Sequence, residues 1–306
     1  MTSSPTDLYH QPPTLADYAG FAAGHGFRLK GSSCPPDQPL ISVITVCFNA
    51  ATSLPATLAS VKAQTYPWIE HIVIDGASTD GTKDILARAE HLAVWISEPD
   101  CGISDAFNKG IALARGRYIG ILNADDEWYP ETASLSVSAL ENHPESAWSF
   151  GGCDFTLDGR IVLHRNGDTN YYRNIHRWMP GFNHPTVITR KESYEIHGLF
   201  NLNYKLAMDY DILLRLHCAG LRGLCLPETL ARMSLGGASN GAGILCALSE
   251  AAEVAVSHGR SRWLARMDLL RASMVPSLRR LATNTGLQRP WRSLKNKYAA
   301  LRIKGN

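Results

Sequence analysis

The feature that most constrains the fold is a series of four short apolar segments that alternate with helix-forming segments. The first segment is almost continuously apolar and β-branched, which is typical of a strand that is covered on both faces. Strands of this kind that alternate with helices predict a parallel, doubly wound sheet with helices on both sides. The four segments are residues 40–48, 71–75, 93–96 and 118–122.

Each of these segments leads into an Asn or Asp. In open α/β sheets ligands bind outside the carboxyl ends of the strands, so we expect these side chains to line one crevice. After the fourth strand, oxygen ligands two residues apart suit a hard divalent cation that is shared with a phosphate. A solvated acidic turn is the alternative for that last pair. The residues are Asn49, Asp75, Asp100, and the pair Asn123 and Asp125.

The second half of the chain has a different pattern. Two segments around the turn Asp158-Gly159 predict an antiparallel hairpin, and residues 205–219 predict a helix. On that helix Asp211 and Arg215 are four residues apart, so we expect them to pair on the surface. Asp209 lies about 200° around the helix from Asp211 and must face elsewhere. The strands expected in this half are residues 147–156, 161–164, 184–189, 224–227 and 229–235.

Composition narrows the class of protein. Hydrophobic residues make up 45% and charged residues 19%, as in soluble globular enzymes. No apolar run approaches the roughly 20 residues of a membrane-spanning helix, and we expect no signal peptide. The seven cysteines are scattered without a Cys-x-x-Cys pair, which argues against a disulfide framework or a zinc site. These features predict a cytoplasmic protein.

Charge is distributed unevenly along the chain. Residues 260–306 carry twelve Lys/Arg against one acidic residue, Asp268, a net charge of +11, whereas residues 1–259 carry a net charge of −9. A basic segment on an acidic body suggests an anionic partner. Nothing in the sequence resembles a nucleic-acid module, so we favour an anionic membrane surface. A solvated helical face is the alternative.

Two nucleotide-binding motifs are absent. A dinucleotide fold needs Gly-x-Gly-x-x-Gly in the first strand–helix turn, but residues 48–53 (FNAATS) contain no glycine. The sequence has no P-loop either, since the glycine-rich segment 236–243 lacks the Lys-Ser/Thr that binds phosphate. These absences argue against NAD-dependent and P-loop chemistry.

Five segments match the motifs of one known family in that family's order: residues 42–49, 73–82, 98–110, 122–126 and 208–215. In these segments, which span roughly residues 40–240, the chain resembles the family 2 glycosyltransferases, which have the GT-A fold and invert the configuration at the anomeric carbon. Two positions depart from the usual motifs: Asn123 replaces the first Asp of the metal motif, and Met208 replaces the Glu that often precedes the base.

The resemblance implies a role for each matching residue. Asp125 would bind Mg2+ or Mn2+ on the donor diphosphate, with Asn123 offering a further oxygen. Asp209 would be the general base for the acceptor hydroxyl. Outside the matching segments, His184 between Asn183 and Pro185 could donate to the diphosphate or the acceptor, with structural packing as the alternative. The residues expected at the base and ribose are Thr45, Asn49 and Asp75, and those expected at the nucleotide or sugar are Asp100, Asp105, Asn108 and Lys109.

The sequence thus predicts a GT-A-like, mostly parallel α/β sheet with a mixed acceptor-side half and C-terminal helices. We expect a flexible N-terminal arm (1–39), a nucleotide-sugar-binding half (40–130), an acceptor-binding half (131–245) and a basic helical region (246–306).

The predicted activity is inverting transfer of a sugar from a nucleotide-diphosphate donor to a hydroxyl of a glycan or lipid-linked acceptor, in surface polysaccharide or exopolysaccharide biosynthesis. The basic C-terminal region would rest on the inner face of the plasma membrane. Two alternatives are a sugar nucleotidyltransferase, whose usual opening glycine-rich loop followed by Arg is missing here, and a non-catalytic nucleotide-sugar-binding subunit.

Overall fold

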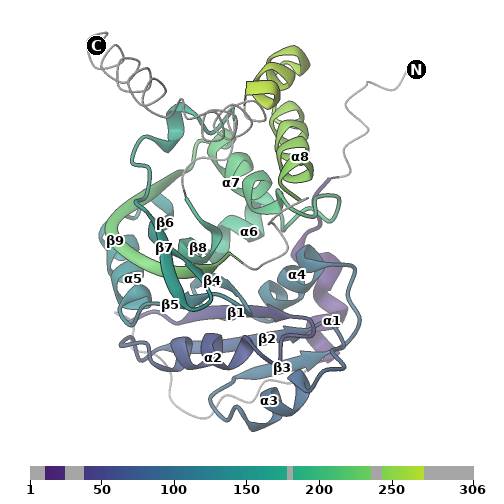
Figure 1. Cartoon of the computed structure of the whole chain (residues 1–306), viewed down its shortest axis with the longest axis vertical. Coiled ribbons are helices and arrows are strands. Elements are labelled where there is room, and N and C mark those ends of the chain that lie inside the picture. Colours follow the sequence, from purple (N-terminus) through teal and green to yellow (C-terminus); the bar gives the residue numbers. More distant parts are fainter. Residues whose placement is uncertain (1–10, 25–37, 178–181, 236–242, 272–306) are drawn as a thin grey trace, which may run out of the picture.

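A single mixed sheet organises the protein (Figure 1). The computed structural model describes residues 11–24, 38–177, 182–235 and 243–271. Within these ranges the strands follow the order β3-β2-β1-β4-β8-β6-β9-β5, and β7 pairs with β6 outside this path. The first four strands are parallel, as predicted from the alternating pattern. They are β1 (Ile41–Cys47), β2 (Ile69–Asp75), β3 (Val94–Ser97) and β4 (Tyr118–Asn123).

The second half extends this sheet with strands of both directions. β8 is antiparallel to β4 and to β6, whereas β9 is parallel to β6. β7 forms a hairpin with β6 at the turn Asp158-Gly159, where both residues have positive φ. The mixed sheet predicted for the second half of the chain is therefore confirmed. The strands are β5 (Glu127–Trp128), β6 (Ser146–Leu157), β7 (Arg160–Arg165), β8 (Ile188–Arg190) and β9 (Arg222–Ser234).

Helices cover both faces of the sheet. On β1 the alternate residues Ile44 and Val46 join a core with α4 and α7, whereas Ile41 and Val43 join a second core with α5. This double coverage explains why all seven residues of β1 are buried. The helices are α1 (Ala19–Gly24), α2 (Leu54–Lys62), α3 (Thr82–Arg88), α4 (Ile103–Leu113), α5 (Thr132–Asn142), α6 (Lys191–His197), α7 (Met208–Cys218) and α8 (Gly243–Ser257).

Two glycines allow close packing against the sheet. A Cβ atom on Gly110 of α4 would collide with the side chain of Ile44, and one on Gly120 of β4 would collide with the indole of Trp128. Helix α4 therefore lies directly on β1, and Trp128 lies directly on β4.

The N-terminal segment 11–24 differs from the flexible arm expected for residues 1–39. It forms a short 3-10 helix (Leu15–Tyr18) followed by α1, and it packs on α4. Tyr18 is 9% exposed, and its hydroxyl donates to Asp105 at 2.7 Å. Apart from residues 38 and 39, the rest of the arm lies outside the described residues.

Three further expectations need correction. Residues 184–186 form a 3-10 turn, and only Ile188–Arg190 are a strand, because Pro185 lacks the N–H that a sheet ladder needs. The two short strands expected between 224 and 235 form one long strand, β9, paired along β6. Asp211 and Arg215 do pair, but the pair is buried, since α8 covers this side of α7.

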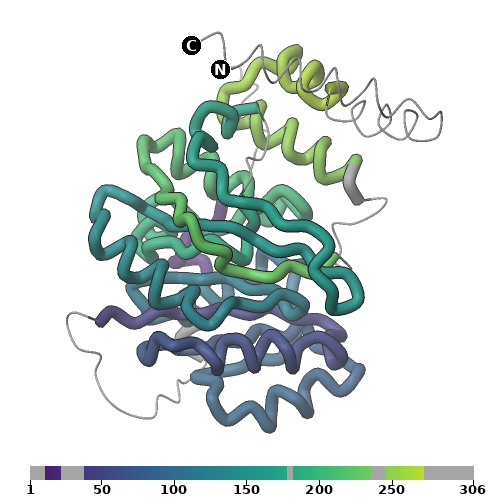
Figure 2. Tube along the Cα trace, turned by 60° about the vertical axis from the view of Figure 1, so that its left-hand side comes forward, coloured from purple at the N-terminus to yellow at the C-terminus, as the bar shows by residue number. Residues whose placement is uncertain are grey.

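The C-terminal region is helical as far as it is described. α8 and a second helix, residues 262–271, lie together at one end of the molecule (Figure 2). Among the helices of the described ranges, none has the length and apolar character that a bilayer crossing requires. The glycine-rich residues 236–242 and the basic residues 272–306 lie outside those ranges.

Candidate active site

The parallel strands bring several of the predicted residues to one edge of the sheet. Asp75 ends β2 beside Cys47 of β1, and Asn123 ends β4 on the other side of β1. Asp100 lies close to the loop after β2: a Cβ atom on Gly76 in that loop would be 2.7 Å from the Asp100 carboxylate. Asn49 joins this group through its side-chain oxygen, which accepts from the N–H of Thr79 at 2.9 Å. These side chains therefore lie at the carboxyl ends of β1, β2 and β4, and their role in lining a ligand crevice stays a prediction.

Asp75 organises the loop that follows β2. Its carboxylate is fully buried and accepts from the backbone N–H and the hydroxyl of Ser78, and from the hydroxyl of Ser97 at 2.6 Å. The hydroxyl of Ser78 is also 2.7 Å from the N–H of Asn49, so one carboxylate fixes both loops. Thr45 is different, because it is fully buried within the sheet and its Oγ1 lies 2.9 Å from Nε2 of His71. The structure does not bring Thr45 to the crevice surface.

The three predicted residues of α4 are held by protein groups. Lys109 pairs with Glu98 at 2.6 Å and with Asp105 at 3.4 Å. Burial raises the pKa of Asp105, but hydrogen bonds from Tyr18 and from the N–H of Cys101, together with Lys109, bring it below the usual value. The amide of Asn108 bonds both the N–H and the C=O of Phe200 at 2.9 Å. These residues therefore join α4 to its neighbours, and their contact with a donor stays a prediction.

The end of β4 is rich in oxygen atoms and poor in counter-charge. Asn123 Oδ1 is buried and accepts no hydrogen bond from any residue that the structure describes. Burial raises the pKa of Asp125, whose carboxylate has no ion pair with another described residue. Asp126 is 1% exposed, and burial together with the charge of Asp125 raises its pKa well above the usual value. An unpaired amide oxygen next to two carboxylates is a setting that a divalent cation would stabilise.

Asp126 was not predicted as part of the site. Its carboxylate accepts from the N–H of Ser234 at 3.2 Å and from the amide of Asn123 at 3.4 Å. The first of these contacts joins β4 to the end of β9, so the acidic strand end is fixed by a residue more than one hundred positions away. The only sequence signal for Asp126 was its place in a run of three acidic residues, 125–127. Across the described ranges, no cluster of three or more His, Cys, Asp or Glu side chains could hold a metal alone.

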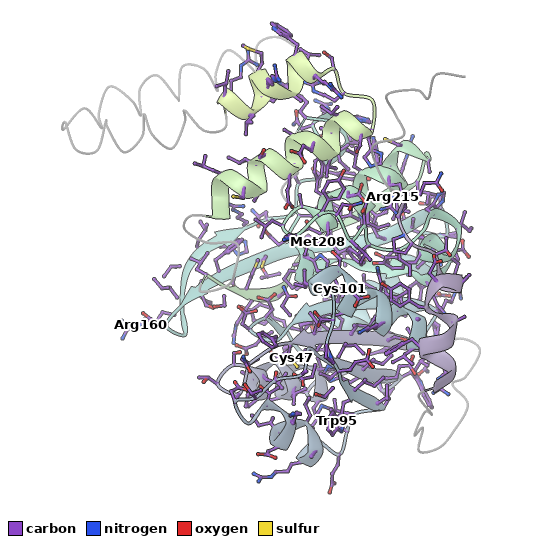
Figure 3. The ribbon with its side chains drawn as sticks, turned by 90° about the vertical axis from the view of Figure 1, so that its right-hand side faces the viewer. Cys47, Trp95, Cys101, Arg160, Met208 and Arg215 are labelled. Atoms are coloured by element: carbon purple, nitrogen blue, oxygen red, sulfur yellow. The ribbon has the colours of Figure 1, made fainter. Side chains whose placement is uncertain are left out.

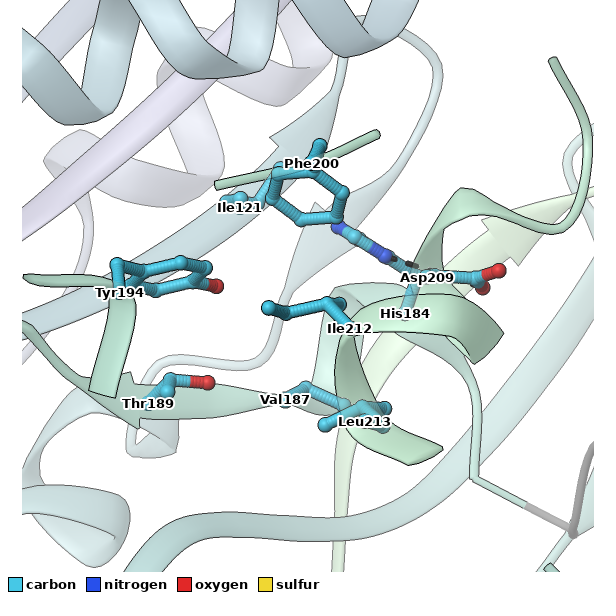
Figure 4. Close-up of a pocket in the computed structure, with 9 residues that line it drawn as sticks. All are labelled: Ile121, His184, Val187, Thr189, Tyr194, Phe200, Asp209, Ile212 and Leu213. Carbon is cyan, nitrogen blue, oxygen red and sulfur yellow. Dashed lines mark ion pairs between the residues drawn. The ribbon is translucent and has the colours of Figure 1, made fainter. Parts of the chain in front are cut away.

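Asp209 and His184 lie next to each other at one end of a small pocket (Figure 4). Asp209 is the second residue of α7, and its Oδ1 accepts the N–H of Tyr210 at 2.8 Å. Its Oδ2 lies 3.8 Å from Nδ1 of His184, which is too long for a hydrogen bond. The ring of His184 stacks on Phe107 with centroids 5.3 Å apart. The pocket is otherwise lined by Ile121, Val187, Thr189, Tyr194, Phe200, Ile212 and Leu213.

The apolar lining sets the charge states of this pair. Burial raises the pKa of Asp209 to about 6 and lowers the pKa of His184 to about 4. At neutral pH the carboxylate is therefore ionised and basic, and the imidazole is neutral. Asp211, on the opposite side of α7, is instead bound to Arg215 and His258, so the two carboxylates face different ways as the helical period predicted.

The protein has an open α/β sheet with acidic residues at the carboxyl ends of its parallel strands, and the second half of the chain, which forms the mixed part of this sheet, carries the buried carboxylate of Asp209 nearby. This combination defines a GT-A-type glycosyltransferase fold. Two solved structures share it. A mannosyltransferase of Pyrobaculum calidifontis in complex with GDP-Man and Mn2+ matches with a TM-score of 0.57 and 20% identity, over 93% of this chain and 91% of that one. Residues 1–349 of TarS from S. aureus in complex with UDP-GlcNAc match with a TM-score of 0.56 and 17% identity, over 75% and 70%.

The protein belongs to glycosyl transferase family 2, whose sequence model matches residues 42–202. The resemblance seen in the sequence is thereby confirmed. A glycosyltransferase of Mycobacterium tuberculosis without an assigned activity is 44% identical over 205 residues, which cover 63% of this chain and 72% of the relative. The putative teichuronic acid biosynthesis glycosyltransferase TuaG of Bacillus subtilis is 41% identical over 134 residues, which cover 42% of this chain and 50% of TuaG.

Proposed function

We propose that the protein is an inverting glycosyltransferase that moves a sugar from a nucleotide-diphosphate donor to a hydroxyl of a glycan or lipid-linked acceptor. The observation that carries this proposal is the place of Asp209. Ile121, two residues before Asn123 on β4, lines the same pocket as Asp209. A buried carboxylate thus lies near the strand end at which we propose that the diphosphate and its cation bind.

In this proposal Asp209 acts as the general base. Its carboxylate accepts the proton of the acceptor hydroxyl while the hydroxyl oxygen attacks the anomeric carbon. The bond from that carbon to the diphosphate oxygen breaks in the same displacement, so the configuration inverts and no covalent enzyme intermediate forms. The apolar lining of the pocket supports the step, because burial raises the pKa of the carboxyl group and so makes the carboxylate a stronger base.

We propose Mg2+ or Mn2+ as the cofactor. Asp125 would hold the cation, and Asn123 would offer its unpaired oxygen, which fits the uncompensated charge at the end of β4. When bound, the cation neutralises the charge that develops on the leaving diphosphate. The Pyrobaculum mannosyltransferase is described with Mn2+, which supports this choice of ion. Asp75, Asn49 and Asp100 would line the nucleotide.

A donor panel tests the activity. Purified protein with Mn2+ is incubated with UDP-, GDP- and dTDP-sugars, and the released nucleoside diphosphate is measured. We expect release from at least one donor, loss of turnover in Asp209→Asn, and donor binding retained in that variant. Pyrophosphate release from a nucleoside triphosphate would support a nucleotidyltransferase instead, and calorimetric donor binding without product would support a non-catalytic binding subunit.

A matched pair of variants tests the cation. Asp125→Asn keeps the shape of the side chain but removes its charge, so we expect Mn2+-dependent binding of the nucleoside diphosphate to weaken by at least about tenfold, the loss that even outer-shell substitutions cause at metal sites. Glu127→Gln, at a half-exposed residue that pairs with Arg232, is the control. Equal binding by both variants would remove Asp125 as the ligand.

We also propose a role in surface polysaccharide biosynthesis at the inner face of the plasma membrane. The assignment of TuaG to teichuronic acid biosynthesis supports this role. The helix 262–271 supports the location, because it exposes Trp263, Leu264 and Leu270 next to exposed arginines. Exposed aromatic and basic side chains on one helix are typical of a segment that lies in a bilayer interface.

A further inference from the structure

Helix α8 lies beyond the segment that matches the family model, yet it contacts the helix that carries Asp209. Its Glu250 carboxylate reaches the chain just before α7. Oε2 of Glu250 accepts three backbone N–H groups in a row, from Lys205 at 3.0 Å, Leu206 at 2.7 Å and Ala207 at 3.0 Å. One oxygen therefore holds the last three residues before the helix begins at Met208. Figure 3 labels Met208 and so shows where this helix start lies in the molecule.

The N–H of Ala207 belongs to the start of α7, and the N–H groups of Lys205 and Leu206 come just before it. The residue before the first turn of α7 is Ala207, whose side chain cannot cap the helix. N–H groups at a helix start need a partner, and a carboxylate there also interacts favourably with the helix dipole. Glu250, on the different helix α8, supplies both the hydrogen-bond acceptor and the negative charge. The charge makes these hydrogen bonds stronger than those to a neutral acceptor.

A second contact fixes the other side of α7. Nε2 of His258, just after α8, lies 3.0 Å from Oδ1 of Asp211. The same carboxylate binds Arg215, which also donates to the carbonyls of His197 and Leu199 at 2.9 Å. Rotation of α7 is therefore restrained at Asp211, whereas its amino end is held by Glu250.

We propose that Glu250 is a positioning residue that fixes the amino end of α7 and thereby the direction of the Asp209 carboxylate. The inference rests on the proposed role of Asp209 as the base. Asp209 is the second residue of the helix, only two positions after Ala207, so movement of residues 205–207 displaces it directly. Misplacing a reacting group by about 1 Å can cost on the order of a hundredfold in rate.

The test compares Glu250→Ala and Glu250→Gln with Glu253→Ala, a control at an exposed carboxylate on the same helix. We expect Glu250→Ala to lower kcat by about 10- to 100-fold with the donor Kd unchanged. Glu250→Gln keeps an acceptor oxygen and should recover part of this loss. By hydrogen exchange, the amides of residues 205–210 should exchange faster in Glu250→Ala than in the wild type, and Glu253→Ala should match the wild type in both measurements.

The two proposals fail in different ways. If the wild type turns over and Asp209→Asn does not, but Glu250→Ala matches Glu253→Ala in kcat, the positioning role is overturned and the glycosyltransferase proposal stands. If no donor is turned over, the proposed function fails, and hydrogen exchange then decides about Glu250: unchanged protection of residues 205–210 overturns the inference. If Glu250→Ala does not fold, Glu250→Gln takes its place in the measurements of kcat and of hydrogen exchange.

Discussion

The buried position of Asp209 makes its charge unfavourable for folding. Its pKa is about 6 in the folded protein against an ordinary 3.8, so the folded state holds the proton more tightly than the unfolded chain. Below pH 3.8 both states are protonated and there is no cost. As the pH rises from 3.8 to 6 the cost grows, and above pH 6 it is fully present. Neutral pH thus combines a competent base with a less stable fold.

Replacing this carboxyl group should therefore stabilise the protein. We expect Asp209→Asn to raise the free energy of unfolding at pH 7.5 by about 1–3 kcal/mol, with the gain vanishing near pH 4. Urea unfolding at the two pH values measures it. The control is Asp211→Asn, because Arg215 and His258 hold the pKa of Asp211 below its usual value despite burial, so this variant should destabilise at pH 7.5. Destabilisation by both variants would show that the charge of Asp209 is compensated.

The same pKa predicts the pH dependence of activity. The base must be ionised, so kcat/KM should fall as the pH drops through about 6, with a tenfold loss per pH unit below it. His184, with a pKa near 4, stays neutral across this range and contributes no second limb. The profile between pH 4.5 and 8 measures this at saturating Mn2+, with nucleoside diphosphate binding followed in parallel. A rate that stays flat down to pH 5 would contradict the assignment.

At the scale of elements, the sequence predicted best what depends on local periodicity. β1, β2, β3 and β4 occur where the apolar segments lie, because a strand that is covered on both faces must be apolar along its whole length. Helical spacing likewise placed α7 within the predicted residues 205–219. Local patterns did not reveal that residues 11–24 pack on α4, since a short helical stretch in a Pro- and Ser-rich segment resembles a flexible arm.

Contacts between distant residues account for the rest of what was missed. The burial of Asp126 depends on Ser234, and the capping of α7 depends on Glu250. Both partners lie in segments whose own sequence pattern gives no sign of the contact. The candidate base could be named from the resemblance, but its surroundings could not.

The packing of α4 on β1 leads to a prediction at this scale. Gly110→Ala places a methyl group against the side chain of Ile44, so α4 must shift or Ile44 must change rotamer. We expect a loss of about 1–3 kcal/mol in the free energy of unfolding. In α1, by contrast, a Cβ atom on Gly20 meets nothing within 4 Å, so Gly20→Ala should be neutral or stabilise by up to about 1 kcal/mol. Equal losses in the two variants would contradict the close approach of α4 to β1.

At the scale of the whole molecule, charge and apolar exposure coincide in the C-terminal region. The basic segment 260–306 opposes an acidic body, and its described part forms the helix 262–271. Trp263 and Leu270 are seven residues apart and therefore lie on one side of this helix, 67% and 55% exposed. The aromatic ring, the leucine and the neighbouring arginines suit an anionic bilayer, which attracts cations and accepts apolar side chains at its interface.

Vesicle sedimentation measures this directly. We expect the protein to bind vesicles of phosphatidylglycerol and phosphatidylcholine, but not phosphatidylcholine alone, and to be released as salt rises from 0.05 to 0.5 M, over roughly the range in which screening shortens from more than 10 Å to about 4 Å. The double variant Trp263→Ala/Leu270→Ala should weaken binding, whereas Ile196→Ala, at a residue 70% exposed on α6, should not. Membrane contact through this helix requires both the arginines and the apolar pair. Binding that depends neither on lipid charge nor on Trp263 and Leu270 would therefore contradict the proposal and show that the basic segment is only a solvated surface.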